Sequence, residues 1–143
     1  MLEGVIIKRI FIFVFLLFLL TGCSKEAGKY LSEEKIDEVE EVSIDVLNDT
    51  ITNKSLEIKI ENNTDESITF NTTDWFMEVY QYQAWYHYAI TVSWIGEEKT
   101  IDTNSFIKEK IEFEALYGKL KKGTYRIVKH VNNWYLADIF VIK

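Results

Sequence analysis

Few residues of this 143-residue chain have the types and the spacing that catalysis or metal binding requires. The two histidines, His87 and His130, lie far apart in the sequence, and neither has an acidic partner at a spacing typical of metal ligands. Glu109, Glu112 and Glu114 alternate with apolar residues, which predicts solvated strand faces rather than a catalytic pair. We therefore expect a protein that is not an enzyme and that has no catalytic residues, no metal site and no cofactor.

Cys23 is the only cysteine of the sequence, so it cannot form a disulfide within one chain. It ends the stretch LTGC, which resembles the bacterial lipobox, in which the cysteine thiol receives a diacylglyceryl group before the preceding segment is cleaved. The apolar run of residues 10–20 stands before it, preceded by Lys8 and Arg9, and is too short to span a bilayer. The sequence therefore predicts a lipoprotein signal peptide at residues 1–22 and a lipid anchor on Cys23, on the extracytoplasmic face of a bacterial cell membrane.

Removal of the signal peptide leaves 14 basic and 22 acidic residues, a net charge of −8. This charge argues against nucleic acid as a partner, and it gives the body of the protein no electrostatic reason to lie flat on anionic lipid. Residues 23–41 are rich in Glu and Lys, and we expect them to form an acidic tether behind the lipidated cysteine. The spacing of Leu31, Ile36 and Val39 also allows one short amphipathic helix there.

Apolar residues recur with a period of two through residues 42–143, which is typical of strands with one buried face. The clearest alternating sets are Val42, Ile44 and Val46; Leu56, Ile58 and Ile60; Ile107, Ile111 and Phe113; Tyr125 and Ile127; and Leu136, Phe140 and Ile142. Turn-forming residues separate these sets, and helix is scarce, with one turn expected in residues 114–120. The pattern predicts one all-β domain, an antiparallel β-sandwich of about seven strands.

Residues 115–131, ALYGKLKKGTYRIVKHV, resemble part of a bacterial immunoglobulin-like domain family that occurs in exported lipoproteins of Gram-positive bacteria. In that family a Tyr-Gly-Lys-Leu stretch, here residues 117–120, leads through a glycine into a Tyr-Arg-Ile-Val strand, here residues 125–128. Trp85 is similar in position to a tryptophan in the middle of the family's domain. The resemblance covers residues 42–143 and implies an immunoglobulin-like sandwich.

Tyr125 stands two residues before Ile127, the relation that a tyrosine-corner residue has to the position where antibody domains keep a buried cysteine. We expect its ring to pack inward and its hydroxyl to bond to the backbone upstream. Gly118 and Gly123 are expected to adopt positive φ angles at corners beside it. The sandwich would lack an intersheet disulfide, with Ile58 or a neighbour facing Ile127.

Residues 75–94 contain eight aromatic side chains. From Ala84 onward the even positions are all apolar and are predicted to face the core, as are Met77 and Val79 in the preceding strand. Residues 81–84 are expected to form the hairpin between the two strands. The side chains that then point outward form a candidate binding patch of Phe76, Tyr80, Tyr82, Trp85 and His87. The alternative is that the tether or a crossing strand covers this face.

These expectations describe a membrane-anchored surface lipoprotein whose immunoglobulin-like domain binds a protein or cell-envelope ligand through the patch. One alternative is an accessory or immunity-type subunit of a membrane protein complex. Another is a cell-wall glycan-binding module that uses the same rings for stacking.

Overall fold

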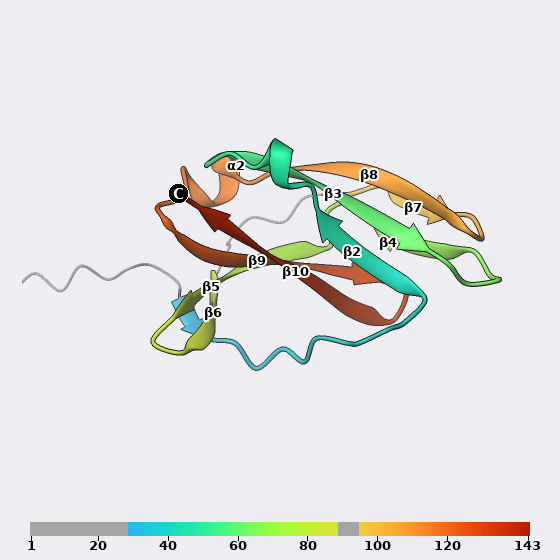
Figure 1. Ribbon diagram of the computed structural model, residues 1–143, viewed down its shortest axis with the longest axis horizontal. Coiled ribbons are helices and arrows are strands. Elements are labelled where there is room, and N and C mark those ends of the chain that lie inside the picture. The colour runs from blue at the N-terminus through green and yellow to red at the C-terminus, as the bar shows by residue number, and fades with distance from the viewer. Residues whose placement is uncertain (1–28, 89–94) are drawn as a thin grey trace, which may run out of the picture.

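Antiparallel β-strands make up almost all of the regular structure in residues 29–88 and 95–143, the residues that this computed structural model describes (Figure 1). One sheet has five strands in the order β1 (Lys29–Leu31), β6 (Ala84–Tyr88), β5 (Trp75–Gln81), β9 (Gly123–Val131) and β10 (Trp134–Ile142). A second sheet has three strands in the order β2 (Val42–Val46), β3 (Ser55–Asn62) and β8 (Ser105–Glu112), and β4 (Ile68–Asn71) pairs with β7 (Glu98–Ile101). A 3-10 turn at Asn48–Thr50 and the four-residue helix α2 (Glu114–Tyr117) complete the elements. The predicted antiparallel β-sandwich is confirmed.

The two sheets meet through alternate residues of their strands. Ile58 and Ile60 of β3 are buried, as are Met77 and Val79 of β5 and Ile127 of β9. They belong to one continuous hydrophobic core. Because full burial of one such side chain contributes roughly 1.5–3 kcal/mol, this core holds the two sheets together without a disulfide.

β5 and β6 join in a two-residue turn at Tyr82 and Gln83, which have φ angles of 51° and 64°. Positive φ at both central residues gives the turn a twist that matches the flanking strands. The hairpin predicted at residues 81–84 is therefore confirmed, and Tyr86 and Tyr88 pack against the core as expected. The remaining residues predicted for that core face, Ile90, Val92 and Trp94, lie outside the described residues.

Tyr125 forms the corner that its position in the sequence suggested. Its hydroxyl donates a 2.8 Å hydrogen bond to the carbonyl oxygen of Lys121, and its buried ring stacks on Phe140 with the ring centroids 5.6 Å apart. Gly118 has a φ of 69°, a conformation that favours glycine. The prediction of a positive φ was wrong for Gly123, which is extended backbone at the start of β9. A Cβ at Gly123 would lie 3.3 Å from the Tyr125 ring, so close ring packing accounts for this glycine.

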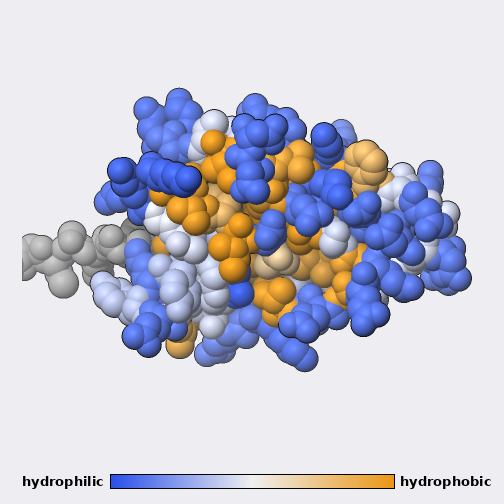
Figure 2. Space-filling model, viewed as in Figure 1, coloured by the Kyte–Doolittle hydropathy of each residue, from blue (hydrophilic) through white to orange (hydrophobic). Residues whose placement is uncertain are grey.

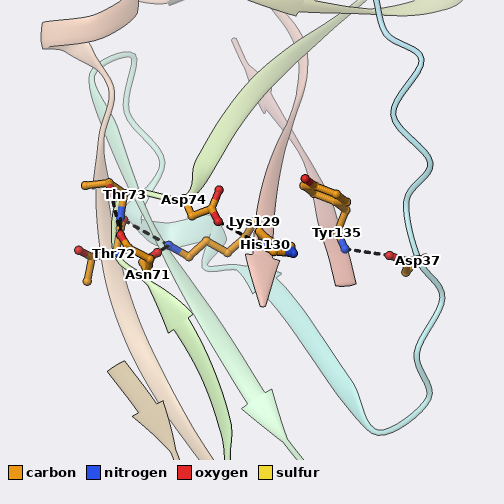
Figure 3. A network of polar contacts seen from close by, with 8 residues as sticks. All are labelled: Asp37, Asn71, Thr72, Thr73, Asp74, Lys129, His130 and Tyr135. Atoms are coloured by element: carbon orange, nitrogen blue, oxygen red, sulfur yellow. Dashed lines mark hydrogen bonds and ion pairs between the residues drawn. The ribbon is translucent and has the colours of Figure 1, made fainter. Parts of the chain in front are cut away.

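A lysine of β9 points into the core between the sheets. Lys129 is fully buried, and its Nζ donates hydrogen bonds to the carbonyl oxygens of Asn71 at 2.8 Å and Thr72 at 3.2 Å (Figure 3). The same Nζ lies 3.2 Å from Oε2 of Glu109 in β8, so the ion pair links the two sheets. Burial lowers the pKa of Lys129 and raises the pKa of Glu109, and the attraction between the two charges opposes both shifts.

Glu109 therefore departs from the prediction that it is solvated. It shares the inward face of β8 with Ile111, and both side chains are buried. The alternation along β8 correctly predicted that Ile111 faces inward. The position two residues earlier also faces inward, and it can hold the charged Glu109 because Lys129 lies opposite. Glu112 and Glu114 are exposed, as expected.

The described part of the predicted tether lies against the five-stranded sheet. β1 pairs with β6 at one edge of the sheet, and residues 32–37, called the strap below, run from there to the start of β10. The backbone N–H of Ser32 bonds to β6 and that of Asp37 bonds to Tyr135 of β10, each at 2.9 Å. Main-chain hydrogen bonds at both ends thus hold a segment whose polar composition is typical of a free linker.

Lys129→Met is expected to lower the free energy of unfolding by about 3–5 kcal/mol, because it leaves the Glu109 carboxylate and two carbonyl oxygens buried without their donor. Urea denaturation measures this loss. The matched control is Lys108→Met, at an exposed position of β8, which should leave the unfolding midpoint unchanged. Equal midpoints for Lys129→Met and the wild type would contradict the proposed link between the sheets.

Candidate functional site

The face of the five-stranded sheet that points away from the core, called the outer face below, carries most of the predicted patch. Tyr80 lies opposite Trp85, and Glu78 lies opposite His87, with Phe76 two residues before Glu78. Residues opposite one another in an antiparallel pair share a face. The Tyr80 and Trp85 rings are 5.2 Å apart between centroids, and the Phe76 and His87 rings are 4.5 Å apart.

Tyr82 does not join the other four residues of the predicted patch. It stands at the tip of the hairpin with 89% of its surface exposed, and its ring contacts Tyr86, whose side chain is on the core-facing side. The period of two that placed Tyr82 beside Tyr80 applies to strand residues and ends at the turn. The outer-face cluster is therefore Phe76, Tyr80, Trp85 and His87.

The strap covers the middle of the outer face. Glu78 and Val128 have no exposed surface, although neither belongs to the core between the sheets. At the far end of the strap, Figure 3 shows Asp37 beside Tyr135, whose backbone N–H donates a 2.9 Å hydrogen bond to the Asp37 carboxylate. The alternative that the tether covers this face thus holds for its middle, whereas the edge formed by β1 and β6 stays open.

Glu78 connects the strap to the sheet. The hydroxyl of Ser32 donates a hydrogen bond to one oxygen of the Glu78 carboxylate, and Nε of Arg126 donates to the other. The Arg126 guanidinium also lies over the Trp85 ring, 4.6 Å from its centroid, in a cation–π contact. A buried carboxylate requires such partners because no water reaches it, so one group orders the strap, β9 and β6 together.

His87 lies between two rings at the open edge. Its imidazole stacks on Tyr30 of β1 at 5.0 Å between centroids, and it also contacts Phe76. Burial lowers the pKa of His87, an effect that Glu78 and Glu34 oppose. Folding favours the neutral imidazole, so the unfolded chain takes up a proton on His87 at a higher pH than the folded protein does. The fold is therefore destabilised at His87 as the pH falls below the ordinary pKa of histidine, and it is unaffected there at higher pH.

A cleft of about 610 Å³ opens where the strap leaves β1. Tyr30, Phe76 and His87 line it with rings, and Glu33 and Glu34 line it with carboxylates. Tyr30 and Leu31 are each 56% exposed at its rim. Rings and carboxylates in this arrangement can stack on a sugar or hold a cationic group, because aromatic faces are apolar and electron-rich.

A second apolar area lies on β10, where Figure 2 shows hydrophobic side chains gathered in the middle of the view. Ile139 and Val141 are exposed there and border a cleft of about 1090 Å³ at the C-terminal end of the strand. This area has no exposed aromatic ring in the residues that the structure describes, so it offers less for a specific ligand than the outer-face cluster does.

Sequence reasoning did not identify Ser32, Glu78, Arg126 or Tyr30 as parts of the site. One signal was present: Glu78 is a charged residue on the same strand face as two aromatic residues, a pattern that indicates a paired charge. Its partner could not be named, because Arg126 is 48 residues away in the sequence.

Residues 29–88 and 95–143 contain no group of three or more His, Cys, Asp or Glu side chains that could hold a metal ion. In the same residues no helix is long and apolar enough to cross a membrane. The second histidine, His130, pairs with Asp74 at 2.9 Å and stacks on Tyr135, whose ring also contacts Phe76 at 6.3 Å between centroids. Cys23 lies outside the described residues.

Glu78→Gln is expected to weaken the hold on the strap, because Arg126 loses its ion pair and Ser32 loses a charged acceptor. The unfolding free energy should fall by about 2 kcal/mol, the range for a hydrogen bond to a charged group. Limited trypsin digestion at Lys35, in the strap, should become faster. Glu61→Gln removes a partly exposed carboxylate from the second sheet and is the control. Digestion at Lys35 that is as slow as in the wild type would contradict the assigned role of Glu78.

The antiparallel fold of the two sheets agrees with the comparison of this sequence with known families. The family model described as a bacterial Ig-like domain matches residues 38–140, a range that includes β2 and most of β10 but excludes β1. No curated protein matches the sequence. A domain of this kind suggests an interaction module, in a family that is generally non-catalytic. The chain belongs to the bacterial Ig-like domain family.

Proposed function

We propose that this protein is a lipid-anchored interaction module, which binds a protein of the cell envelope through the open edge of the outer face. The observation that carries this proposal is the exposure of Tyr30 and Tyr80 beside the rings of Trp85 and His87. Rings exposed around an apolar patch are typical of binding sites rather than of an inert surface.

The rigidity of this cluster supports the proposal. Trp85 is held by the Arg126 guanidinium, and His87 is held between Tyr30 and Phe76. Side chains that are ordered before a partner arrives lose little conformational entropy on binding, so more of the contact energy appears as affinity. The three residues of β1 form the outermost strand of the sheet, and an extended segment of a partner could pair beside them.

The position of the anchor is proposed from the sequence. The stretch LTGC follows an apolar run of signal-peptide length, and two acyl chains on Cys23 would provide stable membrane attachment. In this proposal the domain is held on the extracytoplasmic face of a bacterial membrane, with the outer face available to neighbouring proteins.

A cell-wall glycan is the second candidate ligand. The cleft lined by Tyr30, Phe76 and His87 favours it, because two carboxylates beside stacked rings can accept hydrogen bonds from sugar hydroxyl groups. The accessory subunit of a membrane complex is a special case of the protein partner, and the same experiment addresses it.

Cys23→Ala is expected to abolish acylation and signal cleavage at this site, so the protein should change in apparent mass and should no longer fractionate as a processed membrane protein. Metabolic labelling with a fatty acid followed by membrane fractionation measures both effects. Thr21→Ala leaves the cysteine in place and serves as the control. A Cys23→Ala protein with the mature mass and an unchanged membrane fraction would show that the anchor is not at Cys23.

A photo-crosslinking residue placed at Tyr80 in living cells is expected to give a protein adduct of defined mass. The same residue at Phe106, an exposed aromatic position of β8, is the matched control and should give none. An additional Trp85→Ala substitution should remove the adduct at position 80. Retention of a cell-wall fragment without any protein adduct would favour the glycan, and equal adducts from both positions would contradict a specific outer-face site.

A further inference from the structure

Charged side chains are divided between the two ends of the sandwich. The end called the basic end below is formed by residues 47–54, 81–84 and 113–122 and by the C-terminus. Backbone hydrogen bonds from Leu120 to Asn53 and from Glu114 to Lys54 join the first and third of these segments. The opposite end, called the acidic end, is formed by residues 40–41, 63–67, 102–104 and 132–133.

The count of charges differs sharply between the two ends. The basic end carries five lysines, Lys54, Lys119, Lys121, Lys122 and Lys143, against two acidic side chains, Asp49 and Glu114, and the C-terminal carboxylate. The acidic end carries five carboxylates and no basic residue: Glu40, Glu41, Asp65, Glu66 and Asp102. The net charge of −8 conceals this separation. Figure 2 shows hydrophilic side chains at both ends of the long axis.

Four lysines of the basic end are free to meet an external anion. Lys54 pairs with Glu114 at 3.2 Å, but Lys119, Lys121, Lys122 and Lys143 make no ion pair with any residue that the structure describes. All four side chains are exposed. Lys121 and Lys122 lie beside the β5–β6 hairpin, because they line one cleft together with Gln81.

Tyr82 adds an aromatic ring to the same end. It is 89% exposed at the hairpin tip, and its φ of 51° is a backbone conformation that side chains other than glycine, asparagine and aspartate rarely adopt. Tyrosine is enriched at the boundary between lipid and water, where its ring enters the headgroup region and its hydroxyl stays hydrated. A projecting tyrosine beside unpaired lysines is therefore suited to a bilayer surface.

The chain enters the described structure midway along one edge of the five-stranded sheet, where Lys29 pairs with Tyr88, and β1 runs from there toward the basic end. Figure 1 shows β1 on the side of the sandwich that also carries α2 and the C-terminus. Five residues separate Cys23 from Lys29, so a fully extended chain spans at most about 21 Å between them. A lipid on Cys23 would thus hold the basic end close to the bilayer.

We propose that the basic end docks on an anionic lipid bilayer, with Lys119, Lys121, Lys122 and Tyr82 as the contact residues. The proposal rests on the lipid anchor proposed above, which confines the domain to the bilayer surface and leaves only its orientation to be decided. Each lysine close to an anionic surface favours the docked state by roughly fivefold. The acidic end does not oppose docking, because a nine-residue strand, roughly 30 Å long, separates it from the bilayer, which is several times the Debye length of about 8 Å.

Docking would fix the orientation of the outer face relative to the bilayer. The sandwich would stand with β9 and β10 rising from the membrane, so the cluster around Trp85 would face sideways along the bilayer. A partner would then have to be another membrane-associated protein or a wall component close to the lipid surface.

Energy transfer from a dye on the protein to an acceptor lipid tests this orientation. Acylated Cys23 leaves no free thiol, so Gln83→Cys labels the basic end and Thr103→Cys labels the acidic end in separate samples. The lipidated protein is reconstituted in vesicles of phosphatidylcholine, or of an equal mixture with phosphatidylglycerol. In the mixed vesicles we expect stronger transfer from position 83 than from position 103, and a smaller difference in phosphatidylcholine alone.

Lys121→Gln with Lys122→Gln should lower the ratio of docked to free orientations by about 25-fold, roughly fivefold for each lysine, and should thereby reduce the difference in transfer between the two dyes. Lys35→Gln with Lys108→Gln removes the same charge away from the basic end and should leave the difference intact. Equal transfer from both dyes, or no effect of the Lys121 and Lys122 substitutions, would contradict docking while leaving the anchor in place. A protein that does not float with the vesicles would contradict the anchor and docking together.

Discussion

The carboxylate of Glu78 is buried on the side of the sheet that would otherwise face water, and the rest of the outer face depends on how it is satisfied. Arg126 supplies the opposite charge from β9, and Ser32 supplies a hydroxyl from the strap. Because Arg126 also lies over Trp85, the same interaction fixes the ring that borders the open edge. The strap is therefore part of the domain, and it determines how much of the aromatic cluster a partner can reach.

β9 carries a buried or nearly buried cation on each of its two faces. Arg126 serves the outer face, whereas Lys129 points inward and meets Glu109 of the second sheet. Removing one partner from such a pair leaves an uncompensated charge, so each pair makes the correct strand register more favourable than its alternatives. The hydrophobic core around Ile127 provides the bulk of the stability, and the two ion pairs specify which strands lie together.

Much of the sandwich could be predicted because strand alternation reports the buried face locally. Met77, Val79 and Tyr125 were assigned to the core from spacing alone, and all three are buried there. The burial of Glu78 and Glu109 was not predicted, for a physical reason. A carboxylate is buried only when a cation lies opposite, and local residue spacing does not reveal which distant strands pair. The aromatic residues of the candidate site were predicted from the sequence. That the strap covers part of them was not, because the strap is held by contacts with strands that are distant in the sequence.

Hydrogen–deuterium exchange of the full-length protein, read at single amides, tests most directly whether the strap is part of the folded domain. The Ser32 and Asp37 amides bond to the carbonyl oxygens of Trp85 and Tyr135. Both should exchange far more slowly than an unstructured chain of the same sequence. Exchange of both amides at the unstructured rate, with the Ile127 amide still protected, would contradict the account. The outer face would then be uncovered along its whole width.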